Sequence, residues 1–260
     1  MRYIDSKACE AAMNEFDGNL PFDHCVIDDF LVPGVAELVE NEFLEYDDPK
    51  WHHYKNALED KKALNDWNSF PLTTYQVFGD LMSDEFVDII RKKLRIPIYV
   101  DHGLHGGGWH IHGSGGNLNP HLDYSIHPKM GLLRKLNIII YVSSTLRSEH
   151  GGHLGLWSHD VDGAKPAKLT KEIEPKFNRA VIFDTTQNSW HGMSRPLTQP
   201  DGIYRKSLAI YYLTVPSTGV DSRQRALFAP RDHQKDDQSV IDLIKMRADS
   251  ANYHKAYKKD

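Results

Sequence analysis

The sequence lacks several features that would place it in an extracellular or membrane class. Its 260 residues include only two cysteines, Cys9 and Cys25, which form neither a disulfide framework nor a zinc-binding CxxC spacing. No segment approaches the ~20 consecutive apolar residues of a membrane-spanning helix, and the first residues have no signal-peptide-like apolar stretch. We therefore expect a cytoplasmic protein that does not associate with membranes.

An excess of positive charge is absent as well. The formal net charge is -5 at pH 7, and lysines and arginines are scattered along the chain. Nucleic-acid-binding domains usually gather basic residues on one face or stripe. The sequence thus shows no clear nucleic-acid footprint, and nothing in it indicates an oligomeric state.

The length and the periodicity of apolar residues favour a single catalytic domain over residues 1–260. Its expected parts are a helical and strand extension over 1–95, an all-β core over 96–216 and a helical tail over 217–260. Helices are predicted over 35–45, 83–94 and 238–248. Short segments separated by Gly, Pro, Asn and Asp favour a sandwich or jelly roll. The expected strands are 96–101, 107–113, 119–125, 135–143, 153–157, 168–174, 179–184, 190–194 and 206–215.

Residues 46–72 have no clear period and combine polar residues with Trp51 and Trp67. Unstructured segments of this length in a compact domain are usually functional or disordered. A lid over the active site and an ordered surface loop both fit this composition, and the sequence leaves the choice open.

The segment Pro120-His121-Leu122-Asp123-Tyr124 carries the strongest chemical signal. Residues two apart on a strand face the same side, so His121 and Asp123 can converge on one ion. His191, in a Trp-His-Gly segment on a distant predicted strand, would complete a triad of two histidines and one carboxylate. Such a triad suits non-haem Fe(II) and leaves positions open for chemistry.

The chain has fifteen histidines, and most of them are expected to be hydrogen-bonded residues of turns and strands. His112 and His127 are the alternative ligands because they lie near His121 in sequence. For His127 the following proline favours a turn over metal binding.

A second pair, Arg205 and Ser207, also shares one face of a predicted strand. Arginine offers a planar fork that binds a carboxylate through two hydrogen bonds, which lysine cannot match. Arg195 is the competing arginine, but Arg205 begins a long strand and has Ser207 beside it.

The order HxD, His, RxS, together with Gly151-Gly152-His153-Leu154-Gly155-Leu156-Trp157, resembles the Fe(II)/2-oxoglutarate-dependent dioxygenases, particularly their prolyl-4-hydroxylase-like branch. The resemblance covers roughly residues 21–230. It implies a double-stranded β-helix barrel with flanking helices. It also implies Fe(II) and O2 as cofactors, 2-oxoglutarate as cosubstrate and ascorbate as a candidate reductant.

The same resemblance implies the reaction and the roles of individual residues. The expected reaction hydroxylates an unactivated C–H bond of a peptidyl or free amino acid, such as proline, or of another small molecule, with succinate and CO2 as co-products. His121, Asp123 and His191 would be the catalytic metal ligands, and Arg205, Ser207 and Tyr141 would bind 2-oxoglutarate. The expected substrate contacts are Trp109, His112 and Trp190.

Alternative functions are weighed against this one. Asp123 disfavours halogenation, because halogenating relatives lack the carboxylate ligand. Because the basic residues are scattered, dealkylation of a nucleic acid ranks third, after hydroxylation of an amino acid and hydroxylation of another small molecule. A non-catalytic cupin-like metal- or ligand-binding module remains the main alternative. A structural zinc site is disfavoured, since such sites are four-coordinate and often contain cysteine.

Overall fold

The computed structural model describes residues 1–257, and in this range two β-sheets dominate. The larger sheet has the order β1-β11-β8-β13-β5-β3-β2, with β4 beside β13 and β6 beside β3. Its strands are β1 His24–Ile27, β2 His52–Lys55, β3 Glu59–Leu64, β4 Tyr99–Val100, β5 Gly108–His112, β6 Asn117–Leu118, β8 Leu133–Tyr141, β11 Arg179–Asp184 and β13 Arg205–Thr214.

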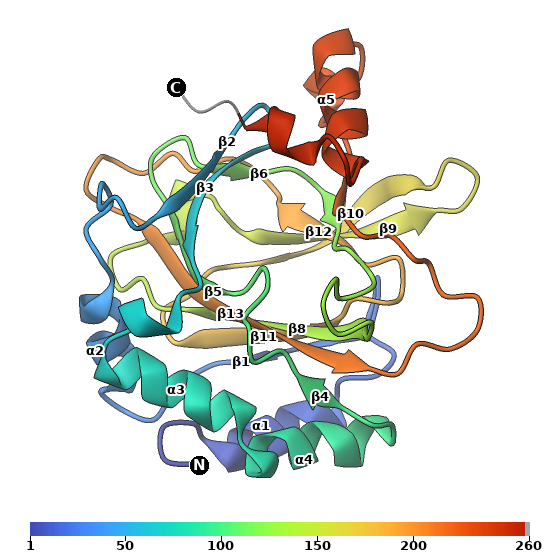
Figure 1. Cartoon of the computed structure of the whole chain (residues 1–260). Coiled ribbons are helices and arrows are strands. Elements are labelled where there is room, and N and C mark those ends of the chain that lie inside the picture. The colour runs from blue at the N-terminus through green and yellow to red at the C-terminus, as the bar shows by residue number, and fades with distance from the viewer. Residues whose placement is uncertain (258–260) are drawn as a thin grey trace.

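The smaller sheet has the order β10-β9-β12-β7-β14, and all its pairs are antiparallel. Its strands are β7 His121–Leu122, β9 Leu154–Asp160, β10 Lys165–Ile173, β12 Trp190–Met193 and β14 Leu227–Phe228. The two sheets lie across from each other (Figure 1) and form a double-stranded β-helix, which confirms the expected fold class.

Four helices cover the outer face of the larger sheet: α1 Ser6–Asn14, α2 Val35–Glu42, α3 Leu72–Met82 and α4 Asp84–Leu94. Helix α4 begins where the Ser83 side chain accepts a hydrogen bond from the Phe86 amide, a normal N-cap. Its apolar stripe packs into the main hydrophobic core with alternate residues of β8 and β13. The fifth helix, α5 Gln238–Ala248, lies at the opposite end of the molecule (Figure 1).

Apolar and cavity-lining side chains alternate along the central strands, so one face of the larger sheet is apolar and the other is polar. On β8, Leu136, Ile138 and Ile140 belong to the main core, whereas Asn137 and Ile139 line a cavity between the sheets. Strands β13 and β5 show the same alternation. The functional side chains therefore lie on the inner face of the sheet, and the helices lie on the other.

Three features differ from the sequence-based expectation. Residues 46–72 are not one loop, because β2 and β3 form a hairpin that extends the larger sheet beside β5. Helix α3 was not expected. Strands β1, β2 and β3 come from the segment assigned to the N-terminal extension, so this segment contributes to the larger sheet. The last residues of the expected tail, 258–260, lie outside the described residues.

Within residues 1–257, no helix has both the length and the apolar character needed to cross a membrane.

Candidate metal centre and cosubstrate pocket

His121, Asp123 and His191 come together on the inner face of the smaller sheet. Strands β7 and β12 pair so that His121 is directly opposite His191, and the two ring centroids are 4.3 Å apart. One potential ligand atom from each of the three residues lies within 4.8 Å of the others. The pairing of β7 with β12 thus brings together two histidines that are 70 residues apart in the sequence.

Backbone carbonyls fix the orientation of both imidazoles. Nδ1 of His121 lies 3.0 Å from the Asn119 carbonyl oxygen, and Nδ1 of His191 lies 2.8 Å from that of Ser189. Since a carbonyl only accepts, each Nδ1 carries the proton and donates. Each Nε2 is then left with a free lone pair, 3.7 Å (His121) and 3.8 Å (His191) from the Asp123 carboxylate. This arrangement is typical of metal-binding histidines.

The Asp123 carboxylate is prepared for a cation. Its Oδ2 is buried and has no hydrogen-bond partner among the described residues, which is costly unless another ligand is bound. Its Oδ1 lies 3.8 Å from Nη1 of Arg134. Two imidazole nitrogens and one carboxylate oxygen on one side of an ion are the ligands of non-haem Fe(II) sites. The residues present therefore fit the metal.

The pKa values of these groups favour the metal-binding protonation states. Burial, and secondly the nearby His191, lower the pKa of His121 to about 3. Burial alone would raise the pKa of Asp123. Electrostatic interactions with His191, Arg134 and His121 and a hydrogen bond with Tyr211 outweigh it and hold this pKa at about 2. At neutral pH His121 is neutral and Asp123 is ionised, as a metal ion requires.

Arg134 is held rigidly beside the triad. Its guanidinium carbon lies 3.4 Å from the ring centroid of Tyr124 and 3.5 Å from that of Tyr211. The side chain also donates to the carbonyl oxygen of His105 and to the Tyr124 hydroxyl. At Gly106, a Cβ would come within 2.8 Å of the same guanidinium, so the absence of a side chain makes room for it.

Arg205 is buried on β13 and lines the same cavity as the triad. Its Nε donates to the Gly152 carbonyl oxygen at 2.9 Å, and its Nη2 donates to the Tyr141 hydroxyl at 3.3 Å. No acidic side chain of residues 1–257 forms an ion pair with it. A buried guanidinium without a counter-charge is unfavourable on its own, and burial lowers its pKa. The site is therefore complementary to a carboxylate ligand.

The neighbours of Arg205 strengthen this complementarity. Ser207 faces the cavity two residues farther along β13, and strand pairing places His112 of β5 opposite Arg205. Both ring nitrogens of His112 are buried without partners. Arg195, the competing arginine, is exposed, and its Nη2 donates to the Ser148 carbonyl oxygen at 3.5 Å.

Two expected substrate contacts are wrong. Trp109 points to the outer face of β5, into the main core, where its ring stacks on Phe43 at 4.5 Å. Trp190 points away from the cavity on β12, and its Nε1 donates to His159 at 3.0 Å. In both cases the neighbouring strand residue, His110 or His191, faces the cavity instead. The alternation of side chains along a strand explains both errors.

The alternative metal ligands are placed apart from the triad. His127 lies in a turn, with its Nε2 3.5 Å from Asp101, and its Nδ1 accepts from the backbone. His112 lines the cavity but is not part of the group that could hold an ion.

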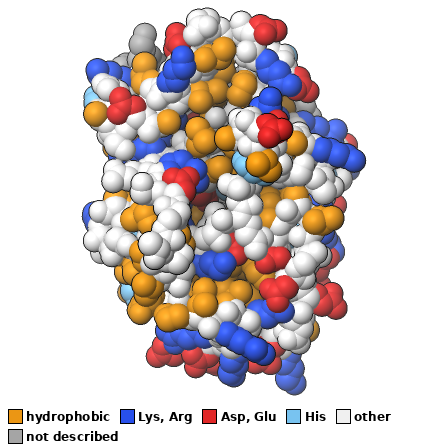
Figure 2. Space-filling view, turned by 90° about the vertical axis from the view of Figure 1, so that its right-hand side faces the viewer, with side chains coloured by type: hydrophobic (Ala, Val, Ile, Leu, Met, Phe, Trp, Pro, Cys, Tyr) orange, Lys and Arg blue, Asp and Glu red, His pale blue; other side chains and the backbone are white. Residues whose placement is uncertain are grey.

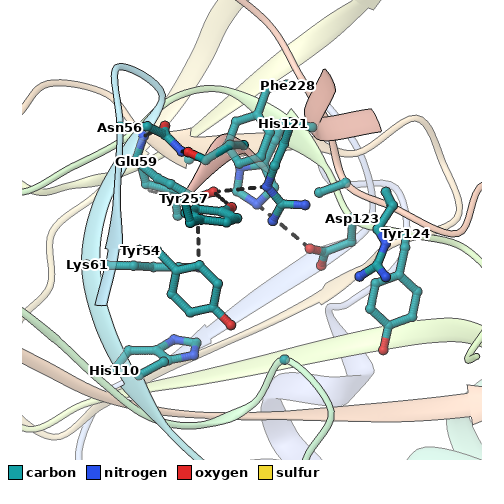
Figure 3. Close-up of a pocket in the computed structure, with 18 of the residues that line it drawn as sticks. Tyr54, Asn56, Glu59, Lys61, His110, His121, Asp123, Tyr124, Phe228 and Tyr257 are labelled. Carbon is teal, nitrogen blue, oxygen red and sulfur yellow. Dashed lines mark hydrogen bonds and ion pairs between the residues drawn. The ribbon is translucent and has the colours of Figure 1, made fainter. Parts of the chain in front are cut away.

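The cavity between the sheets has a volume of about 1650 Å³. The triad and Arg205 form its inner part. Its outer part is lined by the β2–β3 hairpin and by the C-terminal segment, defined here as residues 225–257. Figure 3 shows side chains of the hairpin and of the C-terminal segment around the same space as His121 and Asp123.

A buried carboxylate that the sequence-based reasoning missed joins these two outer walls. Glu59 of β3 is almost completely buried and lies 3.2 Å from Nε of Arg247 and 3.7 Å from Nζ of Lys61. It also accepts a hydrogen bond from the Tyr257 hydroxyl. Figure 3 shows this contact above the ring of Tyr54. Each partner lies far from Glu59 in sequence except Lys61, so no local motif marks it.

Comparisons with known proteins bear on the same region. Residues 107–213 match the sequence profile of the 2OG-Fe(II) oxygenase superfamily. No curated protein matches the chain by sequence.

Similar solved structures share the fold at low sequence identity. A prolyl-4-hydroxylase from Pseudomonas putida is 14% identical, with 80% of this chain and 100% of that chain covered and a TM-score of 0.58. A prolyl hydroxylase from Trichoplax adhaerens, solved with a hypoxia inducible factor peptide fragment, is 16% identical, with coverages of 80% and 91% and a TM-score of 0.56. HygX from Streptomyces hygroscopicus, solved with nickel, 2-oxoglutarate and hygromycin B, is 12% identical, with coverages of 81% and 88% and a TM-score of 0.50.

The profile match spans the strands that carry His121, Asp123, His191 and Arg205, and the fold agrees with it. The resemblance of this chain to the Fe(II)/2-oxoglutarate-dependent oxygenases is thereby confirmed over these residues, and its fold is shared with solved prolyl hydroxylases.

Proposed function

We propose that the protein is an Fe(II)- and 2-oxoglutarate-dependent dioxygenase that hydroxylates an unactivated C–H bond of a small molecule or an amino-acid residue. One observation carries the proposal. A His-Asp-His group with an unpartnered carboxylate oxygen and a buried arginine without a counter-charge border the same cavity. The first group requires a cation, and the second requires an anion.

His121, Asp123 and His191 would hold the iron. When bound, iron with 2-oxoglutarate and O2 supplies the oxidation: 2-oxoglutarate and O2 are converted to succinate and CO2 while one oxygen atom enters the substrate C–H bond. The protein contributes binding, orientation and exclusion of water. The backbone carbonyls of Asn119 and Ser189 keep both imidazoles aimed at the metal position.

Arg205 would bind the C5 carboxylate of 2-oxoglutarate. Its guanidinium is fixed by the Gly152 carbonyl and by the Tyr141 hydroxyl, so little side-chain entropy is lost on binding. Ser207 adds a hydroxyl on the same face of β13. Tyr141 itself is completely buried and acts mainly through its hydrogen bond with Arg205.

The first substrates to test are proline-containing peptides and free amino acids, followed by other small metabolites. The alternative is a non-catalytic cupin-like module that binds a metal or a ligand in the same barrel. That alternative gives no reason for a buried, unpaired Arg205.

An anaerobic titration separates the two functions. Fe(II) and then 2-oxoglutarate are added to the purified apoprotein, with ascorbate present to keep the iron reduced. We expect the weak visible charge-transfer band of a bidentate 2-oxoglutarate chelate, and we expect it to disappear in His191→Ala. A folded, iron-loaded protein without this band would support the binding module instead.

A further inference from the structure

Arg225 lies two residues before β14 and lines the outer part of the cavity. Its guanidinium carbon is 3.4 Å from the ring centroid of Tyr253, and its Nε is buried without a partner. Within residues 1–257 it forms no ion pair and no hydrogen bond. Arg247, the other cavity-lining arginine of the C-terminal segment, is by contrast bound to Glu59.

The charge of Arg225 acts on groups from two other walls of the cavity. The pKa of His105 is lowered to about 4, first by burial and then by Arg134, and Arg225 contributes to the same decrease. Arg225 also opposes the increase in the pKa of Tyr54 that burial and Glu59 cause. The guanidinium thus interacts electrostatically with Tyr54 of the β2–β3 hairpin on one side and with His105, beside Arg134, on another.

The cavity as a whole has an excess of positive charge. Seven lysines and arginines line it in the described part of the chain, against three aspartates and glutamates. The two positive charges of Fe(II) and the two negative charges of 2-oxoglutarate cancel, as do those of Asp123 and Arg205. Glu59 is already occupied by three partners, and Asp242 lies near the rim beside Lys245. An additional anion would therefore be stabilised there.

The remaining wall around Arg225 is aromatic. Tyr54 and Tyr257 form an edge-to-face pair with centroids 5.2 Å apart, and Tyr253 supports the guanidinium from the C-terminal segment. In Figure 3 the ring of Tyr54 lies between Tyr257 and His110 and borders the open space on the side of Asp123. Such rings favour a flat or apolar molecular body next to the charged group.

We propose that Arg225 binds a carboxylate of the substrate, so that the molecule oxidised at the metal centre is a small organic acid whose body lies against Tyr54 and Tyr257. This inference rests on the proposed function and names its substrate class. The carboxylate would be bound at Arg225, and the rest of the substrate, with the C–H bond to be oxidised, would extend inward to the triad.

The test compares 3-phenylpropanoate with its uncharged amide, 3-phenylpropanamide, by calorimetry on the anaerobic Fe(II)- and 2-oxoglutarate-loaded protein. We expect the carboxylate to bind at least about tenfold more tightly than the amide, as for a charge-assisted hydrogen bond. In Arg225→Gln the two ligands should bind within about twofold of each other, and Arg225→Lys should restore part of the preference. Lys235→Gln removes an exposed cation of the C-terminal segment that does not line the cavity and should keep the full preference.

Equal binding of acid and amide to the wild type, no detectable binding of the acid, or an unchanged preference in Arg225→Gln would each overturn the inference. The charge-transfer band is recorded in the same samples. A missing band means that the proposed function has failed, whereas a normal band without a preference for the acid means that only the Arg225 inference has failed.

Discussion

Nη1 of Arg134 lies 3.8 Å from Oδ1 of Asp123, while Oδ2 of the same carboxylate accepts no hydrogen bond from residues 1–257. The two oxygens are not equivalent: Oδ1 lies near Arg134 and 3.7 Å from Nε2 of His121, whereas Oδ2 lies 3.8 Å from Nε2 of His191. We expect Arg134 to hold the Asp123 carboxylate ionised and oriented beside the two imidazoles, where the metal would bind.

Replacement of Arg134 tests this arrangement through metal affinity. Arg134→Met should weaken Fe(II) binding by about 10- to 100-fold, as for other residues that orient a metal ligand. Competition with a chromogenic chelator under anaerobic conditions measures the change. Because Arg134 is buried, Tyr211→Phe is the gentler variant: it removes the hydrogen bond with Asp123 and should weaken binding in the same direction by less. Wild-type affinity in both variants would show that Arg134 and Tyr211 have no influence on the metal.

The three proposed ligands give the second prediction. His121→Ala, Asp123→Ala and His191→Ala should each abolish turnover and lower Fe(II) affinity, since each removes one of three protein donors. Succinate release and the chelator competition are both measured. His102→Ala, at an exposed position outside the cavity, is the matched control. A variant of the triad with normal turnover would remove that residue from the ligand set.

For the cosubstrate, Arg205→Ala should weaken 2-oxoglutarate binding by ~2–5 kcal/mol, the usual effect of removing one partner of a buried charged contact. The measurement follows the charge-transfer band as 2-oxoglutarate is added. Arg195→Ala is the control, because Arg195 is exposed. If Arg195→Ala weakens binding and Arg205→Ala does not, the assignment of the arginine is reversed.

The ion pair of Asp28 with Arg179 predicts a pH dependence of stability. Hydrogen bonds from Arg179 lower the pKa of Asp28 from 3.8 to about 2, with Lys176 contributing and burial opposing. A lowered carboxyl pKa stabilises the folded state above pH 3.8, and this contribution is lost as the pH falls through about 2. Because the Asp28 side chain is 40% exposed, we expect Asp28→Asn to cost only about 1 kcal/mol at pH 7.

Urea unfolding at several pH values measures this effect. The difference between wild type and Asp28→Asn should narrow to roughly half near pH 3. Asp201→Asn, at an exposed position in a loop, should leave the free energy of unfolding unchanged at every pH. A constant difference between pH 7 and pH 3 would contradict the electrostatic origin.

The barrel was predictable because apolar alternation and turn residues mark its central strands. The segment predicted over 179–184 is β11, and the one predicted over 206–215 is β13, shifted by one residue. The same alternation could have excluded Trp190, which must face away from its neighbour His191, and Trp109, which must face away from His110. Choosing aromatic residues by their type rather than by their strand face produced both errors.

The β2–β3 hairpin was not predictable from this kind of pattern. Its strands, His-His-Tyr-Lys and Glu-Asp-Lys-Lys-Ala-Leu, border a polar cavity, so they lack the apolar alternation of a half-buried strand. Glu59 and Arg225 were missed for a related reason. Glu59 is important because it contacts residues that are distant in the chain. Arg225 is important because no residue among 1–257 forms an ion pair with it.

The outer wall of the cavity has a consequence for how such enzymes diverge. The profile match ends at residue 213, whereas the hairpin and the C-terminal segment that form the outer wall both lie outside the matched range. Figure 2 shows a surface hollowed near the middle of one face, with basic, acidic and hydrophobic side chains around the opening. Exchange of residues 225–257 between relatives could therefore change which molecule is oxidised while leaving the iron ligands and the Arg205 site untouched. Substrate choice and oxidative chemistry would then be inherited as separate parts of one gene.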